Sequence, residues 1–125
     1  MYIGMNKILD ELKKSKFRSS FKLKDKDISY IEKNGLENIK IHAYKFVNER
    51  LKDKYIKNDG KQTPYKGHPV FIAMHSTACC CRKCLYKWHK IEPNKELSEK
   101  EIDCIVSIIM EWIIGEYNGS TSNKL

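Results

Sequence analysis

The sequence predicts one mainly α-helical domain of about five helices. The chain has 125 residues, of which 41% are hydrophobic, enough for one core but not for two. Apolar residues between 102 and 113 recur at the three- and four-residue spacing of a helix. The apolar run 70–74 could be a strand, but the sequence offers no second strand to pair with it. We therefore expect a single helical domain over residues 1–117, followed by a disordered polar tail at 118–125.

The first half of the chain predicts three helices and a long loop. Residues 2–16 carry a weak helical pattern. A short second helix is expected to be capped by Asp25 and to end at Gly35, because glycine readily adopts the left-handed conformation that ends helices. A third helix continues over 36–51. Asparagine, glycine and proline then indicate a loop at 52–69.

Two helices are predicted in the second half. Residues 70–76 are compatible with a buried strand or with a helix that has Pro69 at its start, and we favour the helix. Ser98 and Glu101 have the spacing of a capping box and mark the start of the last helix. Its apolar face widens enough to predict a central place in the core, and we expect it to end near Glu116.

The charge of the chain is positive and unevenly distributed. There are 24 Lys and Arg residues against 16 Asp and Glu, a net charge of +8. Residues 13–26 hold seven basic residues and one acid, whereas residues 92–116 hold seven acids and two lysines. This asymmetry predicts a basic surface that binds an anion, such as a nucleotide or a nucleic acid. The alternative is that scattered lysines only keep a small protein soluble.

The sequence predicts a soluble, cytoplasmic protein without a membrane partner. No apolar run reaches the roughly 18 residues of a membrane helix. The first seven residues lack the apolar stretch of a signal peptide. Five cysteines, three of them consecutive, are a poor basis for a disulfide framework, because neighbouring cysteines pair only under strain. We expect reduced thiols.

Cysteine and histidine are concentrated in one segment of fifteen residues. Cys81 and Cys84 have the spacing of a zinc knuckle, and thiolate and imidazole are the donors that zinc prefers. Free packed thiols and an iron–sulfur cluster are the alternatives; a cluster would need Cys79 or Cys104 as its fourth ligand. A continuous helix over 80–89 would also prevent Cys81, Cys84 and His89 from facing one ion. The candidate zinc ligands are His75, Cys80, Cys81, Cys84 and His89.

The polar loop at 58–69 is the second candidate site. Its glycines permit close backbone approach, its lysines supply charge, and its other polar side chains supply directional hydrogen bonds, a combination that suits a phosphate or another oxyanion. The alternative is a solvated connection that ends at Pro69. The predicted contacts are Lys61, Gln62, Thr63, Lys66 and His68, with Arg18 and Arg82 as outer charge.

Known catalytic motifs fit the sequence poorly. It contains no His-Glu-x-x-His, no phosphate-binding Walker loop, and no His-x-Glu of the zinc deaminases. A cysteine nucleophile with a histidine base stays open, with Cys80 or Cys81 beside His75 or His68. The catalytic residues, if any, are not identified by the sequence.

Four motifs in this chain resemble a small bacterial and phage domain family of unknown function. They are Phe-Arg-x-x-Phe-x-Leu at 17–23, the loop motif at 59–71, the cysteine motif at 75–89, and Met-x-Trp-Ile at 110–113. The resemblance implies that Cys79 is dispensable as a ligand, since the family has threonine there. The presence of the family in phages implies host takeover or counter-defence as a setting, including capture or cleavage of a nucleotide signal.

The leading functional hypothesis is a zinc-supported module that binds an anionic ligand. A metal- or cysteine-dependent enzyme that acts on a nucleotide-like substrate is the first alternative, and a protein inhibitor that docks on a host protein is the second. The sequence leaves open whether the chain forms a homo-oligomer.

Overall fold

The computed structural model describes residues 2–123, and the side chains of residues 7–119. This part of the chain contains seven helices and no strand, so the prediction of a mainly α-helical fold is confirmed, although the expected count of five is too low. The helix predicted over 2–16 ends at Lys13, a short additional helix forms at 16–19, and part of the cysteine segment forms a further helix. The helices are α1 (Tyr2–Lys13), α2 (Lys16–Ser19), α3 (Asp25–Asn34), α4 (Leu36–Arg50), α5 (Pro69–Ser76), α6 (Arg82–His89) and α7 (Glu99–Asn123).

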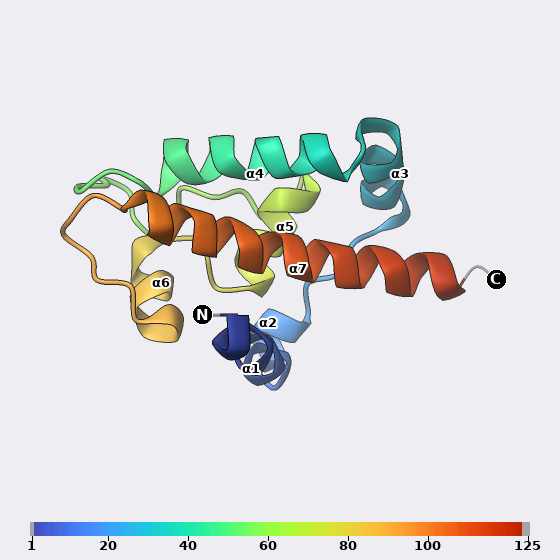
Figure 1. The fold of residues 1–125 in the computed structure, drawn as a ribbon, viewed down its shortest axis with the longest axis horizontal. Coiled ribbons are helices and arrows are strands. Elements are labelled where there is room, and N and C mark those ends of the chain that lie inside the picture. The colour runs from blue at the N-terminus through green and yellow to red at the C-terminus, as the bar shows by residue number, and fades with distance from the viewer. Residues whose placement is uncertain (1, 124–125) are drawn as a thin grey trace.

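The core lies between α4, α5 and α7. Figure 1 shows α4 and α7 side by side along the long axis, running in opposite directions, with α5 against them and α6 near the start of α7. Helix α7 is central, as its apolar spacing predicts. Burial of such aliphatic side chains is the main source of stability for a domain of this size. The fully buried side chains include Ile39 and Val47 of α4, Met74 of α5, and Ile105, Ile109 and Ile113 of α7.

Helix α7 begins as predicted and ends later. The backbone N–H of Ser98 donates to Glu101 Oε1 at 2.9 Å, and the Glu101 N–H donates to Ser98 Oγ at 3.1 Å, which confirms the capping box. The predicted end near Glu116 is wrong, because neither Gly115 nor Gly119 takes the positive φ that ends a helix, and α7 continues to Asn123. Residues 124–125 of the predicted tail lie outside the described residues.

The boundaries of α3 and α5 follow local signals. Gly35 has a φ of +82° and separates α3 from α4 as expected. At the start of α3, the predicted cap is displaced, since the Asp27 carboxylate, rather than Asp25, accepts the Lys24 N–H at 2.9 Å. Pro69 is the first residue of α5, so residues 70–76 are helical and the loop connects α4 to α5. No helix among the described residues is long and apolar enough to cross a membrane.

Candidate metal centre

Three cysteine side chains converge at the start of α6. The Sγ atoms of Cys80, Cys81 and Cys84 all lie within 4.8 Å of one another. This convergence depends on the turn between α5 and α6, in which Ala78 adopts a left-handed φ of +59° and Cys81 is extended. Residues 80–89 therefore do not form one continuous helix, and the geometric objection to a shared ion is removed for these three cysteines.

Cys81 is the N-cap residue of α6. Its Sγ accepts the backbone N–H of Cys84 at 3.4 Å, a local hydrogen bond that orients the Cys-x-x-Cys turn. The positive end of the helix dipole at the start of α6 also favours negative charge, including a thiolate. The local fold thus orients two of the three sulfurs before any ion is bound.

The guanidinium of Arg18, on α2, contacts two of the three sulfurs. Its Nη2 donates to Cys84 Sγ at 3.1 Å, and its Nη1 donates to Cys80 Sγ at 3.6 Å and to the His75 carbonyl at 2.7 Å. The side chain is only 8% exposed. The sequence predicts Arg18 as outer charge around a ligand, but the structure places it against the cysteines.

The thiols of this group differ in pKa. Hydrogen bonds from the Cys80 and Cys81 thiols, followed by the hydrogen bond from Arg18, hold the pKa of Cys84 well below its usual range. The pKa of Cys80 is raised because its proton is held by the neighbouring Cys81 and Cys84 sulfurs. Cys84 is therefore the most acidic thiol of the group, and metal binding would release the thiol protons that remain.

The two histidines predicted as ligands lie outside this group. His75 Nε2 lies 2.9 Å from the Thr63 carbonyl, and His89 Nε2 lies 2.7 Å from the Thr77 carbonyl. Burial lowers the pKa of both imidazoles, so the neutral rings donate these hydrogen bonds. Their ligand roles stay predictions. Cys79 is fully buried beside His89, and burial raises the pKa of its thiol to about 12.

The polar loop contacts the cysteine segment. Thr63 Oγ1 donates to the Cys80 carbonyl at 2.8 Å, and the Thr63 carbonyl accepts from His75. The two segments therefore meet at Thr63. His68 is not part of this contact, since its Nδ1 accepts the Val70 N–H at 3.0 Å and its Nε2 lies 3.1 Å from His42 Nδ1.

Only two of the predicted ligand contacts in the loop are exposed. They are Lys61 and Lys66, whereas Gln62, Thr63 and His68 are buried. Gln62 closes the loop on itself, because its Nε2 donates to Asp59 Oδ1 at 2.8 Å and its Oε1 accepts the Gly60 N–H. The contacts of the buried three are therefore structural, and their binding roles stay predictions.

Residues 6–114 match the family described as Domain of unknown function (DUF4186). The chain belongs to this family. The matched range contains both the polar loop and the cysteine segment. No solved structure matches the chain significantly.

Asp59 belongs to the site of this DUF4186 domain, although the sequence did not predict it as a site residue. Its Oδ1 accepts the Arg82 N–H at 2.8 Å and its Oδ2 accepts the Lys83 N–H at 3.2 Å. Asp59 therefore caps α6 from a distant loop. Its only signal in the sequence is the Asn-Asp-Gly run at 58–60, which indicates a loop and not the cap of a distant helix.

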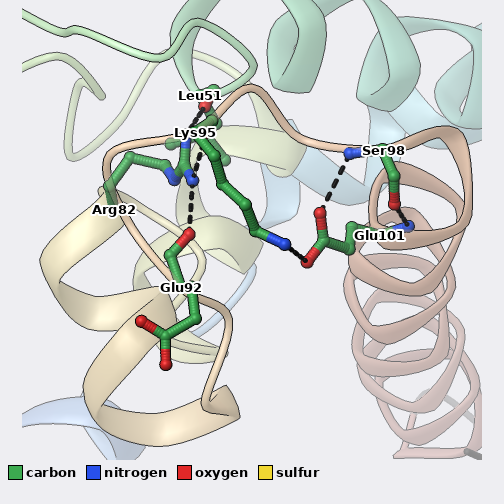
Figure 2. Close-up of polar contacts among 6 residues, drawn as sticks. All are labelled: Leu51, Arg82, Glu92, Lys95, Ser98 and Glu101. Atoms are coloured by element: carbon green, nitrogen blue, oxygen red, sulfur yellow. Dashed lines mark hydrogen bonds and ion pairs between the residues drawn. The ribbon is translucent and has the colours of Figure 1, made fainter.

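Arg82 connects the start of α6 to two distant backbone segments, 51–53 and 92–95, as Figure 2 shows in part. The side chain is 4% exposed, and its Nη1 and Nη2 atoms each donate to two carbonyl oxygens. These bonds occupy all four of its terminal N–H groups. The predicted contact of Arg82 with an anionic ligand is disfavoured by these bonds. The acceptors are the carbonyls of Leu51 at 3.0 Å, Asp53 at 3.1 Å, Glu92 at 2.8 Å and Lys95 at 2.9 Å.

An aromatic stack lies beside the cysteine site. The Tyr65 ring stacks on His75 with 4.2 Å between centroids, and Phe21 stacks on the same imidazole at 5.4 Å. Tyr65 is 61% exposed. The stack therefore exposes the Tyr65 ring to solvent. The ring lies against His75, whose carbonyl accepts a hydrogen bond from Arg18.

Proposed function

We propose that this chain is a zinc-binding module that binds an anionic ligand, a nucleotide or a nucleic acid, on its basic surface. The observation that carries the metal part is the convergence of the Sγ atoms of Cys80, Cys81 and Cys84. The ligand part is supported by the net charge of +8 and by the exposed residues of the polar loop.

The donor set fits zinc. Zn–S bonds of about 2.3 Å place tetrahedral sulfurs about 3.8 Å apart. The thiols, all within 4.8 Å of one another, would therefore move inward by no more than about 1 Å. Three thiolates and a divalent ion carry one net negative charge, which the Arg18 guanidinium offsets. An iron–sulfur cluster with four cysteine ligands has less support, because Cys79 and Cys104 lie outside the group.

The ion would stabilise a part of the domain that has little regular structure. The cysteine turn and the loop after α4 are held together by hydrogen bonds of Thr63, Asp59 and Arg82. A metal at the thiols would add bonds that exist only in the folded chain, so its binding energy would contribute to folding.

Native mass spectrometry of the purified protein, before and after chelation, tests the metal. We expect one zinc ion per chain, lost on chelation and absent from Cys84→Ser. Cys79→Ala is the matched control, because Cys79 belongs to the same cysteine run but lies outside the group, and it should keep the ion. Folded wild-type protein that binds no metal at any zinc concentration would contradict the proposal.

Exposed side chains of the loop support the anionic ligand. Lys61 and Lys66 are exposed on either side of the exposed Tyr65, so a phosphate and a base could be bound within one short segment. The other predicted contacts are buried, so the proposal now depends on these two lysines and Tyr65.

Binding of fluorescent mononucleotides and of short oligonucleotides tests the ligand. Lys61→Ala with Lys66→Ala should weaken binding, whereas Lys40→Ala, an exposed lysine of α4, should not. For a nucleic acid, the affinity should also fall steeply with salt. Product formation detected by mass spectrometry would favour the enzyme alternative. Affinity for a protein that is independent of both loop lysines would favour the inhibitor alternative.

A further inference from the structure

The three-cysteine group has no fourth protein ligand among the residues that the structure describes. A zinc ion in a protein usually takes four ligands, and structural sites obtain all four from the chain. Here the group contains three donors. The nearby imidazoles of His75 and His89 hydrogen-bond to backbone carbonyls, and the His75 ring also contacts the rings of Tyr65 and Phe21.

The three cysteines differ in burial. Cys80 is 7% exposed and Cys81 is 4% exposed, whereas Cys84 is only partly buried. An ion held by these sulfurs would therefore be shielded on the side of Cys80 and Cys81 and reachable near Cys84. Protein sites with three ligands and an accessible fourth position bind an exogenous ligand there.

We propose that the metal keeps its fourth coordination position for an exogenous ligand, and that this ligand is a small thiol. The proposal rests on the proposed metal site. Three thiolates make the ion soft and give the unit one net negative charge, so a sulfur ligand is preferred over a hard oxygen ligand. On binding, the S–H bond of the incoming thiol breaks, a metal–sulfur bond forms in place of bound water, and the proton passes to solvent.

The positive charge of Arg18 favours binding of an anionic fourth ligand. The metal, three cysteine thiolates and one further thiolate would together carry two negative charges. Arg18, which donates to Cys80 and Cys84, reduces this to one. Because the guanidinium is buried, its charge is weakly screened by solvent and salt. Arg18 is thus a positioning residue that favours thiol binding without contacting the thiol itself.

Cobalt substitution of the full-length protein tests the inference, because the visible bands of Co²⁺ report its ligands. The protein is kept reduced with a phosphine, loaded with Co²⁺, and titrated with 2-mercaptoethanol or, as the matched control, with ethylene glycol. We expect a saturable change of the cobalt bands with the thiol and none with the diol. Arg18→Gln should raise the thiol concentration at half-saturation by at least about tenfold, while Lys16→Gln, also on α2, should leave it unchanged.

The outcomes separate the inference from the proposed function. Cobalt that binds to the wild type but not to Cys81→Ser, with bands that the thiol does not alter, would overturn the inference and leave the metal site intact. Bands that change in a folded His75→Gln variant before any thiol is added would show a fourth protein ligand and overturn it also. Failure of cobalt and zinc to bind would overturn both. X-ray absorption of the zinc form gives a second measurement, and we expect three sulfur neighbours without added thiol and four with it.

Discussion

The guanidinium of Arg18 donates a 3.1 Å hydrogen bond to the sulfur of Cys84, 66 residues further along the chain. The same side chain donates to the carbonyl of His75 at the end of α5. Ser76 strengthens the connection, because its hydroxyl donates to the Arg18 carbonyl at 3.1 Å. These hydrogen bonds fix the short helix α2 against α5 and the cysteine turn. They also hold a buried positive charge next to the Cys84 sulfur.

Replacement of Arg18 should destabilise the domain. Arg18→Met would leave the His75 carbonyl and the Cys84 sulfur without their donor, and loss of such charge-assisted bonds costs about 2–3 kcal/mol. Arg18→Lys should cost less, because it keeps the charge. Urea unfolding of metal-free protein measures both effects. Lys16→Met, an exposed position of α2, is the control and should change stability by less than about 0.5 kcal/mol. Equal stability of Arg18→Met and the wild type would contradict this reading of the contact.

Even the conservative substitution Arg82→Lys should clearly lower the stability of the domain. Arg82→Lys offers one nitrogen in place of two, so it cannot reach all four carbonyls, and unpaired buried acceptors should cost about 3 kcal/mol. Thermal unfolding checks this expectation. Lys83→Ala removes the neighbouring exposed side chain and should leave the melting temperature nearly unchanged.

Removal of the Asp59 carboxylate should weaken the start of α6. Asp59→Ala removes the acceptor for the N–H groups of Arg82 and Lys83, a cap worth about 1–2 kcal/mol. Asp59→Asn keeps one oxygen and should lose less. Because Cys84 lies in the same helical turn, Asp59→Ala should also lower zinc affinity, as measured by competition with a chelator. An unaltered zinc affinity in a destabilised variant would separate the cap from the metal site.

Stability should fall in mild acid because of His68. Burial, with a further contribution from His42, lowers the pKa of His68 to about 4 from 6.5. The unfolded chain therefore binds a proton more readily than the folded chain between about pH 6.5 and pH 4, so stability rises with pH in this window and is lost as the pH falls through it. The full contribution is about 3 kcal/mol. His68→Asn can still accept the Val70 N–H and should show a shallower loss in urea unfolding between these pH values. An identical pH profile for the variant would exclude His68 as the cause.

Zinc should raise the unfolding temperature. At a free concentration of 100 times its dissociation constant, an ion that binds only the folded chain adds about 2.7 kcal/mol. Differential scanning calorimetry should therefore show an increase with zinc that chelation reverses. The increase should persist in Cys104→Ser, because Cys104 lies outside the group, and vanish in Cys81→Ser. An increase that survives in Cys81→Ser would assign the ion to other residues.

The elements that the sequence predicts well are those with local causes. Ser98 and Glu101, Pro69, and Gly35 each act on backbone atoms within a few residues, so their spacing alone indicates where a helix begins or ends. The apolar spacing of α7 is equally local. The end of α7 is not predicted correctly, because glycine is compatible both with a helix and with its end. Only the whole fold determines that Gly115 and Gly119 are helical.

The site was predicted only in part, because its geometry depends on distant segments. The clustering of Cys80, Cys81 and Cys84 follows from their spacing once the turn is known. The positions of Arg18 and Asp59 do not, since their partners lie far away in sequence. His75 and His89 lie close to the cysteines in sequence, but their rings donate to the backbone carbonyls of Thr63 and Thr77.

Thr63 has a consequence for how the two proposed binding events would communicate. Its hydroxyl and its carbonyl bind Cys80 and His75, and it stands in the same short segment as Lys61 and Lys66. A ligand that shifts this segment would shift a cysteine backbone, and an ion that fixes the cysteine would restrain the segment. Thermodynamic reciprocity then requires each occupant to alter the affinity of the other by the same factor.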